Sequence, residues 1–230
     1  MTLSQIPLAL KPPRRPGFEN FIAGPNRAVI DTLSSGLEPG QWYFLAGAPG
    51  TGRTHLLSAC FAGLIERGLD ARFMALGARV NWPLLDHADG ACVFLDDIDA
   101  LAADPAGERL LFNALNRWRD SRTVVVMTGV GRSGFQLPDL VSRLGQAVRL
   151  TLRPLDETDL VALVRALAAD HEVVLGRGAV DYLVTRSPRN PAVLARLFEQ
   201  LVVRALSERR TLSIPLIRET CADEGGRSRG

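Results

Sequence analysis

The amino-acid sequence predicts an α/β fold in which a parallel β-sheet is covered by helices and is followed by a small all-helical lid domain. Three observations predict this fold. Apolar, β-rich segments alternate with helical segments up to about residue 153, which is typical of a parallel sheet. A glycine-rich loop of the phosphate-binding type joins one of these strands to a helix. No convincing strand follows Pro154, where helical periodicity takes over.

Four segments are expected along the 230 residues. Residues 1–17 form a flexible tail and linker, because the second half of this stretch is rich in proline. Residues 18–153 form a base domain that carries the sheet, and residues 154–222 form the helical lid. Residues 223–230, rich in glycine and arginine, are expected to be disordered.

Each element of the fold has a sequence signature. Strands are expected in five short segments, residues 42–46, 72–75, 92–96, 124–128 and 147–150. A helix over 108–119 places Leu111, Leu115 and Trp118 on one face and its charges on the other, as a helix covering a sheet does. Lid helices are expected over residues 156–169, 178–186, 192–208 and 215–221.

The phosphate-binding loop follows the strand over 42–46 and opens a helix over 54–67. It consists of Gly47-Ala48-Pro49-Gly50-Thr51-Gly52-Arg53-Thr54. Its glycines allow the backbone N–H groups to wrap the phosphates of a nucleotide, and the Thr54 hydroxyl would hold Mg²⁺. The nucleotide-binding residues expected here are Pro49, Gly50, Thr51, Gly52, Arg53, Thr54 and His55.

Arginine stands where this kind of loop usually has lysine. The lysine ammonium is a compact charge that follows the phosphates, whereas the planar fork of Arg53 grips oxygens in a fixed geometry. We therefore expect nucleotide binding to survive and hydrolysis to suffer. The chain has a single lysine, Lys11, so a general use of arginine in place of lysine is an alternative explanation.

Two carboxylates end the apolar strand over 92–96. Asp96 would orient the water shell of Mg²⁺, and Asp97 would polarise an attacking water. The alternative is that this acidic run simply begins a helix, whose N-terminus favours negative charge. Thr128, at the end of the next strand, would touch the γ-phosphate, whereas Gly129 and Val130 after it cannot position a water.

Arg143 is a cation among apolar residues on a short predicted helix. One interpretation is a surface ion pair with Asp139, four residues earlier. The other is an arginine finger, which completes the ATP site of a neighbouring molecule rather than its own.

Composition excludes several classes of protein. The formal net charge is only +2, which gives no basis for strong non-specific binding to DNA. The cysteines Cys60, Cys92 and Cys221 lack the spacing of metal ligands and are expected to be reduced thiols of a cytosolic protein. No secretion signal and no stretch of 18 uncharged apolar residues occurs, so we expect a cytoplasmic protein without a membrane partner.

Five short motifs give residues 18–220 a resemblance to AAA+ modules of the DnaA/Hda family. The motifs span residues 21–26, 52–57, 96–98, 140–144 and 212–215. The resemblance implies an AAA+ P-loop NTPase module that binds ADP or ATP with Mg²⁺, and arginine in place of the loop lysine is part of the Hda pattern. Segment 21–26 resembles the stretch that frames the adenine, so Phe21, Ile22, Ala23 and Asn26 are further candidate nucleotide-binding residues.

The family resemblance also implies partners. It assigns Arg143 to promoting ATP hydrolysis by DnaA, which inactivates DnaA and suppresses re-initiation of replication. Residues 5–10 resemble the peptide by which bacterial replication proteins dock on the DNA polymerase sliding clamp, with Gln5 as polar anchor and Leu8 and Leu10 in an apolar pocket. Such docking would place the protein at the replisome. The alternative is that this apolar tail packs back on the domain.

Some features depart from the family pattern. Val130 stands where an acidic residue is expected, and Ala192 stands where the lid arginine is expected, so Arg189 or Arg196 would have to contact the phosphates instead. No helix-turn-helix follows the lid, and we expect no direct sequence-specific DNA binding.

Three functional interpretations therefore remain. The preferred one is a nucleotide-dependent regulator with weak or absent ATPase activity of its own. The alternatives are an autonomous ATPase of the helicase-loader type acting on single-stranded DNA and a clamp-tethered scaffold with a vestigial nucleotide site. Two tyrosines and a near-neutral charge argue against a basic, aromatic DNA groove. Whether the chain forms a homodimer is left open.

Overall fold

The computed structural model describes the backbone of residues 14–227 and the side chains of residues 14–222. The expected clamp-binding residues Gln5, Leu8 and Leu10 lie outside the described residues. Two compact units are present, a base domain over residues 16–153 and a helical lid that begins at Pro154.

The base domain contains a five-stranded sheet in which every pair of neighbours is parallel. Its strands are β1 (Trp42–Ala46), β2 (Ala71–Ala75), β3 (Cys92–Asp96), β4 (Val124–Gly129) and β5 (Val148–Thr151). The order β2-β3-β4-β1-β5 places β3, β4 and β1 side by side. Because their carboxyl ends share one edge, the segments that follow these strands are brought together. The parallel sheet predicted from the sequence is confirmed.

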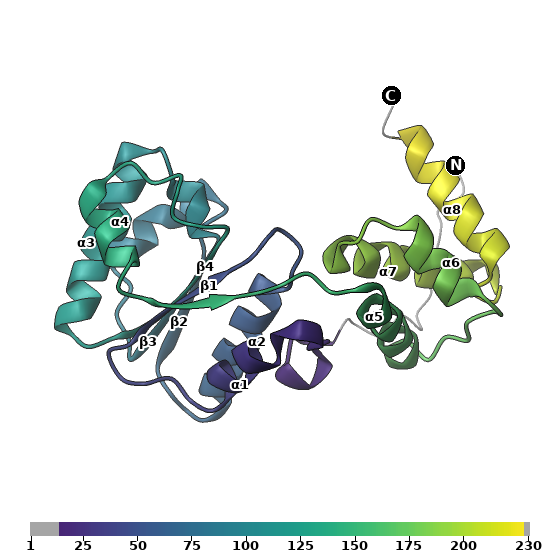
Figure 1. The fold of residues 1–230 in the computed structure, drawn as a ribbon, viewed down its shortest axis with the longest axis horizontal. Helices are drawn as coiled ribbons and strands as arrows, with labels where there is room; N and C mark the ends of the chain where they lie inside the picture. Colours follow the sequence, from purple (N-terminus) through teal and green to yellow (C-terminus); the bar gives the residue numbers. More distant parts are fainter. Residues whose placement is uncertain (1–13, 228–230) are drawn as a thin grey trace. The chain divides into compact units, whose positions relative to one another are not determined.

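Helices cover both faces of the sheet (Figure 1). The α-helices of the base domain are α1 (Arg27–Ser34), α2 (Arg53–Glu66), α3 (Pro105–Asp120) and α4 (Pro138–Leu144). Short 3₁₀ helices are η1 (Phe18–Asn20), η2 (Gly24–Asn26), η3 (Arg79–Asp86) and η4 (Ile98–Leu101). Alternate residues of β1 face opposite layers: Phe44 packs with Trp118 of α3, and Leu45 packs with Leu56 of α2.

Helix α3 begins earlier than its apolar spacing predicts. Pro105 occupies the first helical position, and Asp104 caps the helix by accepting hydrogen bonds from the backbone N–H groups of Ala106 at 3.0 Å and Gly107 at 2.8 Å. One expectation is wrong: the charges of this helix are not all on the outer face. Glu108 is only 2% exposed, because it stands one turn before Leu111 on the buried stripe.

The lid is all-helical apart from one isolated bridge between Leu175 and Leu212 within the described residues. Its helices are α5 (Glu157–Asp170), α6 (Ala179–Arg186), α7 (Pro191–Glu208) and α8 (Ile214–Arg227). The predicted cap of α5 is present, because Asp156 and Asp159 exchange side-chain to backbone hydrogen bonds. Helix α8 continues past Cys221 into the segment that was expected to be disordered. The predicted end of this helix at residue 221 was therefore too early.

Burial agrees with the interpretation of the first two cysteines. Cys60 and Cys92 are both buried, and burial raises the pKa of the Cys60 thiol to about 12. Cys221, in contrast, is exposed on α8. None of the helices in the described part of the chain is long and apolar enough to cross a bilayer.

Candidate nucleotide-binding site and finger helix

The glycine-rich loop forms a tight turn between β1 and α2. The loop is closed by Thr51, whose Oγ1 donates to the Ala48 carbonyl at 2.8 Å. Gly50 and Gly52 have φ angles of 84° and 96°, which favour glycine. A Cβ atom at Gly47 would lie 2.6 Å from Thr51 Oγ1. The backbone therefore keeps a shape that side chains at the glycine positions would destroy.

The loop ends at the N-terminus of α2, a helix of 14 residues. Its N-cap is Gly52, which supplies no side-chain cap, so the first N–H groups of the helix donate no hydrogen bond to a capping side chain. Such a terminus is suited to bind an anion through its N–H groups and its dipole. The loop and the helix N-terminus thus fit the phosphates of a nucleotide.

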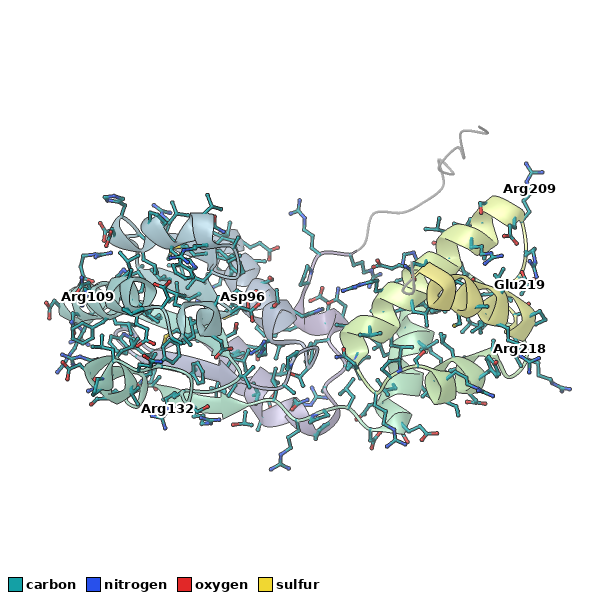
Figure 2. The ribbon with its side chains drawn as sticks, turned by 90° about the horizontal axis from the view of Figure 1, so that it is seen from above. Asp96, Arg109, Arg132, Arg209, Arg218 and Glu219 are labelled. Carbon is teal, nitrogen blue, oxygen red and sulfur yellow. The ribbon has the colours of Figure 1, made fainter. Side chains whose placement is uncertain are left out.

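Asp96 brings two hydroxyl groups together at the end of β3. Thr54 Oγ1 donates to Asp96 Oδ2 at 2.9 Å, and Thr128 Oγ1 donates to Asp96 Oδ1 at 2.6 Å. Asp96 is buried within the base domain (Figure 2). The predicted Mg²⁺ residues Thr54 and Asp96 therefore lie side by side. Among the described residues, no group of three or more histidine, cysteine, aspartate or glutamate side chains that could hold a metal ion occurs.

Thr128 is buried against Asp96 and Asp97 and is not exposed to solvent. Its side chain is fully buried, and its Oγ1 also accepts a hydrogen bond from the Asp97 backbone N–H at 2.9 Å. The hydroxyl therefore fixes the turn between Asp96 and Asp97. The contact between Thr128 and the γ-phosphate that the sequence indicated remains a prediction.

Arg53 is held by two carboxylates. Its Nη2 lies 3.0 Å from Asp97 Oδ1 and its Nη1 lies 3.5 Å from Asp99 Oδ2, and the side chain is only 10% exposed. Burial and the neighbouring negative charge of Asp96 raise the pKa of Asp97, and the Arg53 charge opposes this effect. The acid expected to polarise water is thus paired with the arginine of the phosphate loop.

Asp99 was missed by the sequence analysis as a part of this site. Its Oδ2 accepts a hydrogen bond from the backbone N–H of Val130 at 2.6 Å. A Cβ atom at Gly129 would lie 2.9 Å from Asp99 Oδ1, so the carboxylate occupies the space of the missing side chain. A carboxylate from η4 therefore lies beside positions 129 and 130, where it is bound by the Val130 N–H and by Arg53. The acidic run over 97–99 was the available signal, but it was weighed only as a helix start.

Segment 17–26 packs against the phosphate loop. The Phe21 ring stands edge-on to His55 with centroids 5.3 Å apart, and a Cβ atom at Gly52 would meet it at 2.5 Å. His55 Nε2 lies 2.9 Å from the Gly17 carbonyl, which can only accept, so this nitrogen donates. Burial lowers the pKa of His55. Phe21 and His55 thus lie beside the loop as predicted residues of the site.

The other predicted residues of segment 17–26 are not described in direct contact with the phosphate loop. Ile22 and Ala23 are partly buried next to Phe21. Asn26 is buried, and its side chain both donates to the Arg153 carbonyl at 3.0 Å and accepts from the Arg153 N–H at 2.7 Å. This pair fastens the segment to the chain that follows β5, so the Asn26 amide supports the site rather than pointing into it.

Arg143 lies on α4, away from the phosphate loop in the sequence. Leu140 and Leu144 of this helix are buried in the core, whereas Arg143 is partly exposed. Within residues 14–222, the Arg143 guanidinium makes no hydrogen bond and no ion pair, and Asp139 is not its partner. The structure therefore does not contain the ion pair that was the alternative interpretation.

The candidate arginines of the lid are exposed. Arg189 pairs with Glu157 at 3.5 Å between Nη2 and Oε2, and both side chains are largely exposed, so the pair contributes little to stability. Asn190 caps α7, and Ala192 and Arg196 lie exposed in its first two turns. Contact between a lid arginine and phosphate remains a prediction.

The sheet order, the phosphate loop, the Thr54–Asp96 pair and the helical lid together define a P-loop module of the AAA+ class. Residues 156–221 match the family model described as the Hda lid domain. The lid is thus similar to that of Hda, in agreement with the resemblance that the sequence motifs indicated.

Solved structures agree on the fold. Domain III of DnaA from Thermotoga maritima superposes with a TM-score of 0.76 at 20% identity, over 90% of this chain and 95% of that chain. AMPPCP-bound DnaA from Aquifex aeolicus gives 0.69 at 20% identity, over 83% and 66%. The RuvB Holliday junction branch migration motor of Thermotoga maritima gives 0.63 at 20% identity, over 84% and 67%. At this identity the likeness concerns the fold, and the roles of single residues remain predictions.

Proposed function

We propose that this chain binds an adenine nucleotide, ADP in preference to ATP, together with Mg²⁺, and uses it as a structural ligand. Docked on the DNA polymerase sliding clamp, it stimulates ATP hydrolysis by DnaA through Arg143 and so negatively regulates the initiation of chromosome replication. The observation that carries the proposal is the contrast between two arginines. Arg53 is ion-paired within the chain's own site, whereas the Arg143 guanidinium has no partner among the described residues.

The geometry of the chain's own site favours binding over turnover. Thr54 and Asp96 would hold Mg²⁺, which supplies positive charge to the phosphate oxygens. A base that activates water must be within reach and unengaged, but Asp97 is paired with Arg53. Neither Gly129 nor Val130 offers a side chain that could position a water. We infer that hydrolysis by this chain alone is weak or absent.

Arg143 has the properties that action on a second molecule requires. The transition state of phosphoryl transfer spreads negative charge over the transferred group, and a guanidinium placed there is worth roughly 10³ to 10⁵ in rate. Such a group must not be neutralised by its own chain, and Arg143 satisfies this condition. Its helix is anchored by Leu140 and Leu144, so the cation is presented from a fixed support.

Clamp docking rests on the resemblance of residues 5–10 to clamp-binding peptides. Gln5 would be the polar anchor, and Leu8 and Leu10 would enter an apolar pocket. Tethering on DNA-bound clamp would raise the local concentration of Arg143 near DnaA. The regulator would therefore act where replication is under way.

The direct test is phosphate release by purified DnaA-ATP, with and without this protein, in the presence of DNA-loaded clamp and ADP. The proposal expects stimulation that requires the clamp and that disappears when Gln5 and Leu8 are both replaced by alanine. The matched control is the same variant assayed for ADP binding, which should be unchanged. Unchanged DnaA hydrolysis, together with turnover by this protein alone on single-stranded DNA, would instead favour the autonomous ATPase of the helicase-loader type.

A further inference from the structure

Glu108 is a buried carboxylate that binds only backbone. Its Oε1 accepts hydrogen bonds from the N–H groups of Ala103 at 2.8 Å and Gln136 at 2.9 Å. Its Oε2 accepts from Gln136 at 2.9 Å and from Leu137 at 2.6 Å. Glu108 is only 2% exposed. Among the described side chains it forms no ion pair with a cation.

This arrangement is not what packing alone would select. A buried carboxylate loses its hydration, so it persists only where hydrogen bonds replace the water. An apolar residue on this stripe of α3 would fill the space, but it would leave the N–H groups of Ala103, Gln136 and Leu137 without this acceptor. The carboxylate therefore has a specific task, which is to hold these two stretches of backbone against α3.

The two stretches are the turn after η4 and the start of α4. Leu137 is the N-cap residue of α4, which has only seven residues. A helix this short is not stable by itself, so anchors outside it fix its position. Leu140 and Leu144 hold its inner face, and Glu108 holds its first turn. Ala103, with φ of 62°, belongs to the turn that follows η4, so one carboxylate fixes α4 relative to that turn.

We propose that Glu108 is the positioning residue for Arg143. The inference rests on the proposed function, because it assigns Glu108 to the presentation of Arg143 to the phosphates of a partner ATPase. Glu108 does not touch the reacting atoms. It sets where α4 begins and therefore where the guanidinium is delivered. In phosphoryl transfer, a displacement of about 1 Å can cost about 10²-fold in rate.

The test compares Glu108→Gln with Asp104→Asn in the partner-stimulation assay. The glutamine keeps one carbonyl acceptor but turns an amide NH₂ toward backbone N–H groups. Asp104 is the N-cap of the same helix and accepts from Ala106 and Gly107, so Asp104→Asn is the matched control for exchanging a carboxylate for an amide at α3. We expect Glu108→Gln to lower the maximal stimulated rate at least tenfold. The regulator concentration giving half-maximal stimulation and the ADP affinity should stay within about twofold. Asp104→Asn should keep the maximal rate.

Two further measurements separate positioning from folding. Amide hydrogen exchange over residues 131–144 should speed up in Glu108→Gln and not in Asp104→Asn. Adding Glu108→Gln to Arg143→Ala should cause no further loss of stimulation, because both act through one guanidinium. A fall in ADP-binding stoichiometry that matches the loss of rate would assign Glu108 to folding and overturn the inference.

The outcome with Arg143→Ala distinguishes the two proposals. If Arg143→Ala abolishes stimulation while Glu108→Gln keeps the full maximal rate, the positioning role is wrong and the proposed function stands. If Arg143→Ala itself keeps full stimulation, the proposed function is wrong, and the positioning role fails with it.

Discussion

The phosphate loop and helix α4 each carry an arginine, and their surroundings are opposite. Arg53 is nearly buried and is held by Asp97 and Asp99, whereas the Arg143 guanidinium has no hydrogen bond or ion pair within the described side chains. The first arginine is committed to its own site, and the second is available to another molecule. This difference is the basis of the proposal that nucleotide binding and activation of hydrolysis are divided between two sites of one chain.

The largest expected effect follows from removing the unpaired arginine. Arg143→Ala should lower stimulated DnaA hydrolysis by about 10³-fold, the lower end of the range for arginine fingers. ADP affinity and thermal stability should change little, because the guanidinium makes no interaction with the described residues. Phosphate release and calorimetric ADP titration would check both points. Arg109→Ala is the matched control, since Arg109 is an exposed cation on the neighbouring helix α3 (Figure 2). Equal losses in both variants would mean that charge alone matters.

The second prediction concerns the loop that holds the other arginine. Gly52→Ala places a methyl group 2.5 Å from the Phe21 ring at a φ of 96°, a conformation that costs an L-residue about 1–3 kcal/mol. We expect a loss of ADP affinity of at least tenfold, measured by calorimetry. Gly63→Ala is the control, because Gly63 lies inside α2 with nothing within 4 Å of the added atom. That variant should be more stable by about 0.5–1 kcal/mol. Unimpaired ADP binding by Gly52→Ala would contradict the described loop.

The third prediction concerns a substitution that removes the ion pairs of Arg53. Arg53→Ala leaves Asp97 and Asp99 without their cation, so we expect stability to fall by about 1–3 kcal/mol in urea unfolding. Arg72→Ala removes an ion pair with Asp70 in which both side chains are about half exposed, and it should cost about 0–1 kcal/mol. Equal small effects would show that Arg53 is not restrained as described.

The smallest expected effect is a pH dependence from His55. Burial lowers the folded-state pKa of His55 below the ordinary histidine value of 6.5. Between these two pKa values the unfolded chain binds more protons, so stability falls as the pH drops below about 6.5, by at most about 1.4 kcal/mol per pH unit. Asp97 acts in the opposite direction, because its folded-state pKa is raised. Its contribution to folding stability falls as the pH rises above 3.8. Unfolding of His55→Gln between pH 7.5 and 5.5 should show a flatter profile than the unsubstituted chain. An identical slope would contradict the burial of His55.

Local patterns in the sequence were sufficient for the sheet, the phosphate loop and the lid, because strands, glycine turns and helix caps depend on near neighbours. They were also sufficient to place Thr54 beside Asp96, since parallel strands end at one edge. Asp99 and Glu108 were not found, because their partners are backbone N–H groups about 30 residues away. Backbone donors carry no residue identity, so the sequence does not indicate which N–H groups these carboxylates bind, although the acidic run over 97–99 marked Asp99 as a candidate. Only the helical spacing of Glu108 with Leu111 could have indicated that it is buried.

The division between the two arginines is tested most directly by assaying Arg53→Ala and Arg143→Ala side by side, measuring both ADP affinity and DnaA phosphate release at saturating ADP with DNA-loaded clamp. We expect a crossed result. Arg53→Ala should bind ADP more weakly and still stimulate DnaA, whereas Arg143→Ala should bind ADP normally and fail to stimulate. If either variant loses both properties together, one site serves both tasks and the division proposed here is wrong.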